Sequence, residues 1–275
     1  MKRTNLIFAA TLLVFATFFA ACEKNDATDP MVETSQEDDQ VAALYDDVTN
    51  EVDDVTMSSS PAKSSSNFEI SNAGSGTRTI ETSYSGDTTI RTITFVNFIN
   101  GNSMNGHIKN GIIVVKILGG RLEATFERTI TFQNFTIDDI KIEGEKQIVK
   151  TSDYVYSVVL TGGKVTFTDG TTYTREFTHT RTWTEGFDTP TNIWDDVFTV
   201  EGTATGVNRK GYAYTHTIIN ALVIKNTCRW ITEGTIDLSV NDKTATLDYG
   251  DGTCDNLGTI TVNGKTTEIK LRGKR

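Results

Sequence analysis

Hydrophobic and polar residues alternate with a period of two along much of the chain after residue 67. In the clearest run, 171–185, every second residue is a threonine or a glutamate, and the residues between them are Tyr173, Arg175, Phe177, His179, Arg181 and Trp183. Successive side chains of a β-strand point to opposite faces, so this run predicts one long strand with an aromatic and basic face. Residues 121–133 alternate in the same way and predict a second strand.

Glycine-containing pairs predict tight turns between these runs. Asp169-Gly170 and Asn263-Gly264 are strong signals for two-residue hairpins, because both central positions of a type I′ turn need positive φ. Three further candidate pairs are Gly119-Gly120, Gly162-Gly163 and Asn110-Gly111. Consecutive hairpins build an antiparallel meander. We therefore predict an all-β domain over residues 67–275, formed by a single large antiparallel meander sheet that is strongly twisted or curled into a partial barrel.

The hydrophobic pattern before residue 67 is different. Apolar residues recur at helical spacing and predict a short helix over 36–56. They are Val41, Leu44, Val48, Val52 and Val55. Acidic residues surround this thin stripe, and like charges repel, so we expect the helix to form only when it docks. Serine-rich residues 58–66 are typical of a linker. Residues 22–66 thus predict a flexible acidic tether.

The first residues of the chain have the pattern of a targeting signal. Lys2 and Arg3 precede an apolar run over 6–19, which is followed by Ala20-Ala21-Cys22, as in a secretory signal peptide. A cysteine directly after two alanines resembles the leader of bacterial lipoproteins, in which that cysteine carries acyl chains such as palmitate and becomes the new N-terminus. We expect a signal peptide over 1–21 and an anchor at Cys22. An uncleaved anchor helix and an ordinary signal with an incidental cysteine are the alternatives.

Charge is distributed unevenly along the chain, whose formal net charge is −10. Residues 22–66 hold 12 acidic and two basic residues, whereas residues 67–275 hold 24 acidic and 22 basic ones. The β domain is therefore nearly neutral and has no lysine or arginine stripe. Nucleic-acid binding depends on the neutralisation of phosphates, so no nucleic-acid partner is expected.

Three cysteines become two once Cys22 is assigned to the lipid. Cys228 and Cys254 would then face an oxidising compartment, where an even pair predicts a disulfide. The alternative, a metal site, is disfavoured because neither cysteine belongs to a CxxC motif or has a histidine nearby.

No metal, cofactor or catalytic residue is expected. The carboxylates of loop 247–255 suggest calcium, but a turn pinned by the disulfide explains them as well. Zinc usually needs three or four ligands, and His107, His179 and His216 have no acid or cysteine at ligand spacing. No GxSxG motif is present, and the adjacent acids Asp138-Asp139 and Asp195-Asp196 would point apart on a strand.

The aromatic and basic row of 171–185 is a candidate ligand face for a glycan or a peptide. Its members are Tyr173, Arg175, Phe177, His179, Arg181 and Trp183, and Trp194 is a separate aromatic candidate. The alternative is that the row is simply core, with arginines whose charged ends reach water.

The C-terminal part of the chain carries its most distinctive motifs. These are Cys228-Arg229-Trp230, then Leu247-Asp248-Tyr249-Gly250-Asp251-Gly252-Thr253-Cys254-Asp255-Asn256, and finally Asn263-Gly264. With the leader, they make the chain resemble uncharacterised secreted lipoproteins of Gram-negative bacteria. The resemblance implies a location in the cell envelope and a β-rich body, and it brings no catalytic residues.

These patterns favour a lipoprotein of the outer membrane, on its periplasmic face or at the cell surface. We expect a non-catalytic role in binding a ligand or partner, or a structural role. One alternative is a periplasmic carrier that holds lipid or another apolar ligand in the concavity of the curled sheet. Another is a hydrolase whose site the sequence does not reveal.

Overall fold

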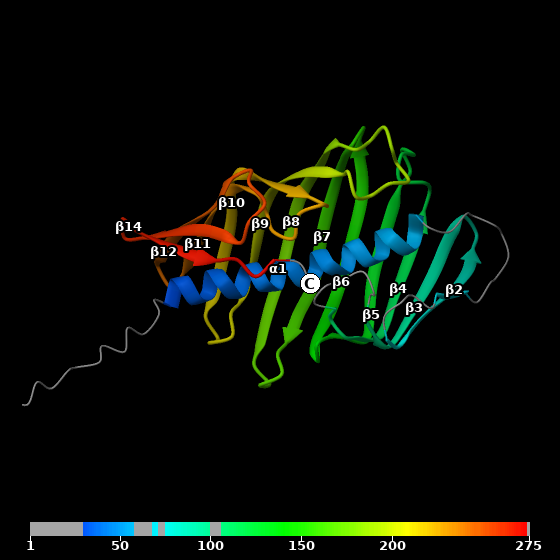
Figure 1. Ribbon diagram of the computed structural model, residues 1–275, viewed down its shortest axis with the longest axis horizontal. Coiled ribbons are helices and arrows are strands. Elements are labelled where there is room, and N and C mark those ends of the chain that lie inside the picture. The colour runs from blue at the N-terminus through cyan, green and yellow to red at the C-terminus, as the bar shows by residue number, and fades with distance from the viewer. Residues whose placement is uncertain (1–29, 58–67, 71–74, 100–105, 274–275) are drawn as a thin grey trace, which may run out of the picture.

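One open antiparallel sheet dominates the computed structural model, which describes residues 30–57, 68–70, 75–99 and 106–273. Fourteen strands follow one another across the sheet in sequence order (Figure 1). They are β1 (Phe68–Ile70), β2 (Thr77–Ser85), β3 (Thr88–Phe98), β4 (Lys109–Leu118), β5 (Glu127–Ile137), β6 (Ile140–Ser152), β7 (Val155–Thr166), β8 (Thr172–Glu185), β9 (Val197–Val207), β10 (Ala213–Lys225), β11 (Glu233–Val240), β12 (Lys243–Asp251), β13 (Leu257–Val262) and β14 (Lys265–Lys270). The predicted antiparallel meander is confirmed, and the sheet does not close.

A long helix, α1 (Pro30–Met57), crosses the inner face of this sheet (Figure 1). Pro30 is its first residue, a position where the missing amide hydrogen of proline costs no hydrogen bond. The apolar stripe predicted from the sequence is buried, since Val41, Leu44, Val48, Val52 and Val55 are each at most 1% exposed. They form one core with the inward-facing residues of the strands.

The expectation of a flexible tether is wrong for residues 30–57. The helix is 28 residues long, not confined to 36–56, and it is part of the folded core. The reason is electrostatic: the acidic residues that we expected to repel one another meet basic side chains of the sheet, as in the pair Asp38–Arg175. The leader, Cys22 and the serine-rich segment 58–66 lie outside the described residues.

One of the predicted two-residue hairpins is confirmed, and the other is right in its position but not in its length. Asn263 and Gly264 have φ of 51° and 77° and form the two-residue hairpin between β13 and β14. Asp169 and Gly170 lie in the β7–β8 hairpin, although its loop spans five residues, with a hydrogen bond from Phe167 N to Thr171 O of 2.9 Å.

Other turn predictions need correction. Gly162-Gly163 and Asn110-Gly111 do not end strands, because they form bulges inside β7 and β4, where the pairing register shifts. A bulge and a hairpin both use positive φ, which glycine adopts easily. Gly119-Gly120 does follow β4, but the turn continues over 121–126, so the strand predicted over 121–133 begins only at Glu127.

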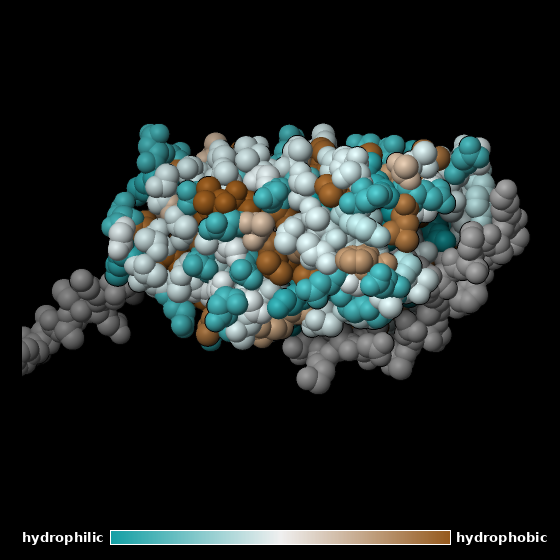
Figure 2. Space-filling view, turned by 90° about the horizontal axis from the view of Figure 1, so that it is seen from above, coloured by the Kyte–Doolittle hydropathy of each residue, from teal (hydrophilic) through white to brown (hydrophobic). Residues whose placement is uncertain are grey.

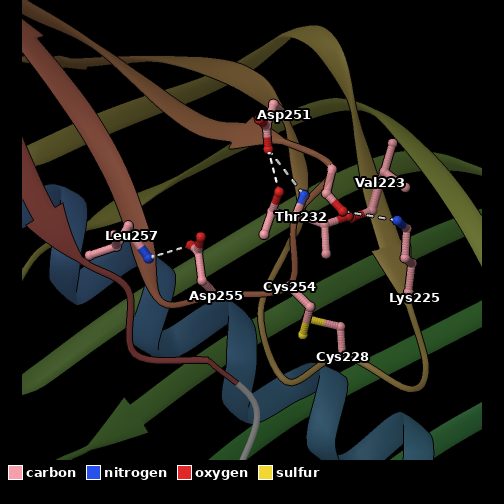
Figure 3. Close-up of a disulfide and its surroundings, with 10 residues drawn as sticks. Val223, Lys225, Cys228, Thr232, Asp251, Cys254, Asp255 and Leu257 are labelled. Carbon is pink, nitrogen blue, oxygen red and sulfur yellow. Dashed lines mark hydrogen bonds between the residues drawn. A yellow bond between two sulfur atoms is a disulfide. The ribbon is translucent and has the colours of Figure 1, made fainter.

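The predicted disulfide between Cys228 and Cys254 is present, with its Cα atoms 5.7 Å apart (Figure 3). It ties the loop between β10 and β11 to the loop after β12. The acidic residues of the second loop stabilise its turns: Asp251 accepts from Thr253 N at 3.2 Å, and Asp255 from Leu257 N at 2.9 Å. A loop shaped by such bonds agrees with the interpretation of 247–255 as a pinned turn.

Candidate ligand cavity

Buried ion pairs fix the N-terminal half of α1 to the sheet. Asp38 is fully buried, pairs with Arg175 of β8, and lies 2.6 Å from Nδ1 of His216 on β10. The hydroxyl of Tyr173 donates to the same carboxylate at 3.0 Å. Burial alone would raise the pKa of Asp38, but Arg175 and His216 hold this pKa well below its usual range. Asp38 is therefore a charged group whose partners all come from the sheet.

A second set of ion pairs fixes the C-terminal half of α1. Glu51 pairs with Arg78 of β2 and Lys109 of β4, and Asp53 pairs with Arg128 of β5. Asp38 and Glu51 are 13 residues apart, or about 20 Å along a helix. The helix is thus held at two places on a curved surface.

A cavity of about 270 Å³ lies between the C-terminal half of α1 and the sheet. Asp53 and Thr56 of α1 line one side of it. Its apolar walls are Ile117, Phe126, Ile148, Tyr156 and Phe198. Cavities that bind drug-sized ligands measure roughly 300–1,000 Å³, so this one suits a somewhat smaller molecule.

Four arginines line the same cavity, namely Arg91, Arg121, Arg128 and Arg181. Arg128 pairs with Asp53, and Arg121 donates to the Asp196 carboxylate at 2.6 Å. Arg91 donates to the carbonyl of Val55 at 2.6 Å. Among the described residues, no carboxylate forms an ion pair with Arg91 or Arg181. The cavity therefore has more positive than negative charge.

Aromatic rings hold two of these guanidinium groups. Arg181 lies over the ring of Phe198 and Arg121 over that of Trp183, each 3.6 Å from the ring centroid. Burial lowers the pKa of Arg181 because it disfavours the charged form. Stacking on a ring fixes the plane of a guanidinium, which leaves its nitrogen atoms directed at a defined place.

A smaller void of about 60 Å³ lies beneath the middle of α1 and shares Arg181 with the cavity. Burial lowers the pKa of Lys146 to about 8, and its ammonium donates to Thr49 Oγ1 at 2.7 Å. Burial also lowers the pKa of His179 to about 2, with nearby Arg175 adding to the effect, so His179 is neutral. The charged side chains that line this void are thus Lys146, Arg175, Arg181 and Asp46.

The structure gathers the predicted aromatic and basic row but covers it. Tyr173, Arg175, Phe177 and Trp183 are at most 8% exposed on the inner face, with His179 and Arg181 partly buried beside them. The grouping is right, yet α1 lies over the row, so these residues do not form an open face for a glycan or a peptide. Trp194 is 60% exposed on the loop before β9 and lines neither space.

Of the four arginines that line the cavity, only Arg181 was among the predicted site residues, and Arg91, Arg121 and Arg128 were missed. Two of them carry a signal that could have been read. Arg128 has the same parity as Phe126 and Ile130, and Arg91 the same parity as Ile93 and Phe95, so each interrupts an apolar row. Arg121 belongs to a turn and has no such signal.

The other candidate residues are dispersed. His107 pairs with Asp138, while His179 and His216 lie on the inner face of the sheet. In the part of the chain that the structure describes, no group of three or more histidine, cysteine or acidic residues is placed to hold a metal ion. Asp138 and Asp139 form the β5–β6 turn, and Asp195 and Asp196 differ in their partners, Thr189 and Arg121.

Comparison with known proteins adds no relative. No family model, curated protein or solved structure matches this chain. Within the described ranges, no helix has the length and apolar character that crossing a bilayer requires.

The surface away from the cavity offers little apolar area. Figure 2 shows one side of the molecule as mainly polar, with apolar residues in small separate patches. Among the described residues, the most exposed large apolar side chains are Trp194, Ile219 and Val96, on three different elements. The cavity is thus the feature of the structure that best fits a ligand.

Proposed function

We propose that this chain is a lipid-anchored protein of the bacterial outer membrane that holds a small apolar molecule beneath α1 without catalysis. The observation that carries the proposal is the cavity of about 270 Å³ with its apolar walls. It lies in the concavity of a curled sheet, which favours the carrier over a binder that uses exposed aromatic residues. The leader pattern ending at Cys22 supports the anchor.

The acids around the cavity favour binding over hydrolysis. Asp53 and Asp196 each pair with an arginine through one carboxylate oxygen, Oδ1 of Asp53 with Arg128 and Oδ2 of Asp196 with Arg121. Burial by itself would raise the pKa of Asp53, but Arg128 and Arg121 hold it below its usual value. Glycoside hydrolysis needs two carboxyl groups that flank one bond, and of these two only Asp53 lines the cavity.

A neutral fluorophore tests the cavity. N-phenyl-1-naphthylamine should bind the folded chain saturably, with a rise in fluorescence as it leaves water. Ile117→Trp places a larger side chain in the cavity and should abolish this binding. The matched control is Ile219→Trp, at a position that is 55% exposed and outside the cavity. Binding that is unchanged by Ile117→Trp, or the absence of saturable binding, would contradict the proposed cavity.

Detergent partition tests the anchor. The wild-type chain, expressed in a Gram-negative host, should enter the detergent-rich phase and incorporate labelled palmitate. Cys22→Ser should incorporate no labelled palmitate, because the diacylglycerol is attached to the Cys22 thiol. A Cys22→Ser chain that still incorporates labelled palmitate would disprove lipidation at this residue, and a wild-type chain that enters detergent without labelled palmitate would favour an uncleaved anchor helix.

A further inference from the structure

The side chain of Arg181 stands out among the basic groups of the inner face. Arg175 has Asp38, Arg78 has Glu51 and Asp54, Arg128 has Asp53, and Arg121 has Asp196. Among the described residues, Arg181 makes no ion pair or hydrogen bond; its Nε is buried without a partner, as the Nε atoms of several paired arginines are, but no other nitrogen of Arg181 has a partner among these residues either. A buried charge without a partner is costly, so a fold normally provides one.

The position of Arg181 indicates where such a partner would lie. It lines both the large cavity and the smaller void, and its guanidinium is held over the Phe198 ring at 3.6 Å. Arg91, the other cavity arginine without a carboxylate, lines the same cavity and uses one nitrogen on the Val55 carbonyl. Both side chains therefore have donors left for a bound group.

The charges that face Arg181 from each neighbouring element leave a positive excess. Asp46 and Asp53 of α1 attract it, while Arg121 and Arg128 from the sheet repel it. Asp46 lies 3.8 Å from the Lys146 ammonium, and Asp53 pairs with Arg128. With Asp196 on Arg121, each of these three acids has another cation, and among the described residues no ion pair compensates the charge of Arg91 or Arg181.

We infer that the cavity binds a small amphiphile with one anionic head, a carboxylate or a phosphate, which accepts hydrogen bonds from Arg181. This inference rests on the proposed function, because it names the class of the ligand that the cavity would hold. The guanidinium fork suits a planar or tetrahedral oxyanion through two parallel hydrogen bonds. Ile117, Phe126 and Ile148 would enclose the apolar chain. The cavity volume limits this chain to a short one.

Four probes with the same eight-carbon chain and different head groups distinguish the contribution of the head group from that of the chain. Calorimetric titration of residues 22–275 with Cys22→Ser, which keeps every described residue, would use octanoate, octyl phosphate, 1-octanol and octylamine. We expect at least one anion to bind about tenfold or more tightly than 1-octanol, since charged hydrogen bonds contribute about 1.5–3 kcal/mol and 1.4 kcal/mol is tenfold. Octylamine should bind most weakly. The anion that binds more tightly shows whether the site prefers a carboxylate or a phosphate head group.

Substitutions then assign the effect to Arg181. Arg181→Met should reduce the affinity for the anion roughly 10–100-fold and leave that for 1-octanol unchanged. It should fold, because it replaces a partly buried charge that has no ion-pair partner among the described residues by an apolar side chain. Arg181→Lys keeps the charge but not the fork, and should weaken anion binding less. Lys116→Met removes an exposed charge of β4 and should change nothing.

The outcomes separate the inference from the proposed function. The inference is overturned if the anions bind no more tightly than 1-octanol, or if their affinity is unchanged in both Arg181 variants. Either result would leave the proposal of an apolar cavity standing. If none of the four probes binds, and the neutral fluorophore does not bind either, the proposed function fails together with it.

Discussion

Asp38→Ala should show how much the docking of α1 depends on buried charge. Asp38 and Arg175 have side chains that are 1% and 2% exposed, and the carboxylate also meets His216 and Tyr173. Removal of one partner leaves Arg175 as an uncompensated buried cation, which typically costs about 3–5 kcal/mol. Since domains of this kind have a free energy of unfolding of roughly 5–15 kcal/mol, the loss should be large.

Urea denaturation, followed by tryptophan fluorescence and by circular dichroism, measures this loss. The matched control is Glu33→Ala, which removes an acid of the same helix whose side chain is 42% exposed and whose partner Lys210 is 45% exposed. Solvent screens an exposed pair, which therefore contributes little to stability, so this variant should be nearly as stable as the wild type.

A double variant tests the reason for the loss. Asp38→Leu with Arg175→Met replaces the pair by apolar side chains and should recover most of the stability, because the uncompensated charge is gone. The reasoning is refuted if Asp38→Ala costs no more than Glu33→Ala, or if the double variant is less stable than Asp38→Ala.

Three further predictions follow from other parts of the structure. Burial raises the pKa of Asp39 to about 6, so between pH 4 and 6 the folded chain binds more protons than the unfolded chain. The free energy of unfolding should therefore fall by up to about 3 kcal/mol as the pH rises through this window. Urea titrations at several pH values should show this slope in the wild type and a flatter one in Asp39→Asn. Replacing both Cys228 and Cys254 by serine opens a link between residues 26 apart and should lower the free energy of unfolding by about 3.5 kcal/mol, whereas no change would show that the link adds no stability. Gly202→Ala should lower the melting temperature more than Gly162→Ala. Both positions have positive φ, but a Cβ at Gly202 would lie 2.3 Å from Thr178 O, whereas a Cβ at Gly162 would meet open space. Equal shifts in melting temperature would contradict the clash at Gly202.

Much of the fold could be predicted from local patterns. Alternation in 171–185 correctly placed six side chains on one face, because the period of a strand is a property of the backbone. The hairpin at Asn263-Gly264 followed from the φ angles that its two residues tolerate. The disulfide followed from counting the cysteines that remain once Cys22 is assigned to the predicted leader.

The docking of α1 onto that face of the sheet could not be predicted in the same way. Asp38 and Arg175 are 137 residues apart, and nothing local shows that the acids of one segment match the bases of another. The same limit applies to Gly162-Gly163, since a bulge and a turn demand similar glycines. The cavity depends on the curvature of the whole sheet and on the height at which α1 crosses it, so no single segment encodes it.

The most direct test of the ligand site is the NMR signal of the Arg181 Nε–H group. In ¹⁵N-labelled protein, the signal that disappears in Arg181→Met can be assigned to this arginine, whose Nε is buried without a partner. Addition of octanoate or octyl phosphate should shift it strongly and in a saturable manner, while 1-octanol should move it little. An Nε–H signal that stays in place while either anion saturates the protein would contradict the account.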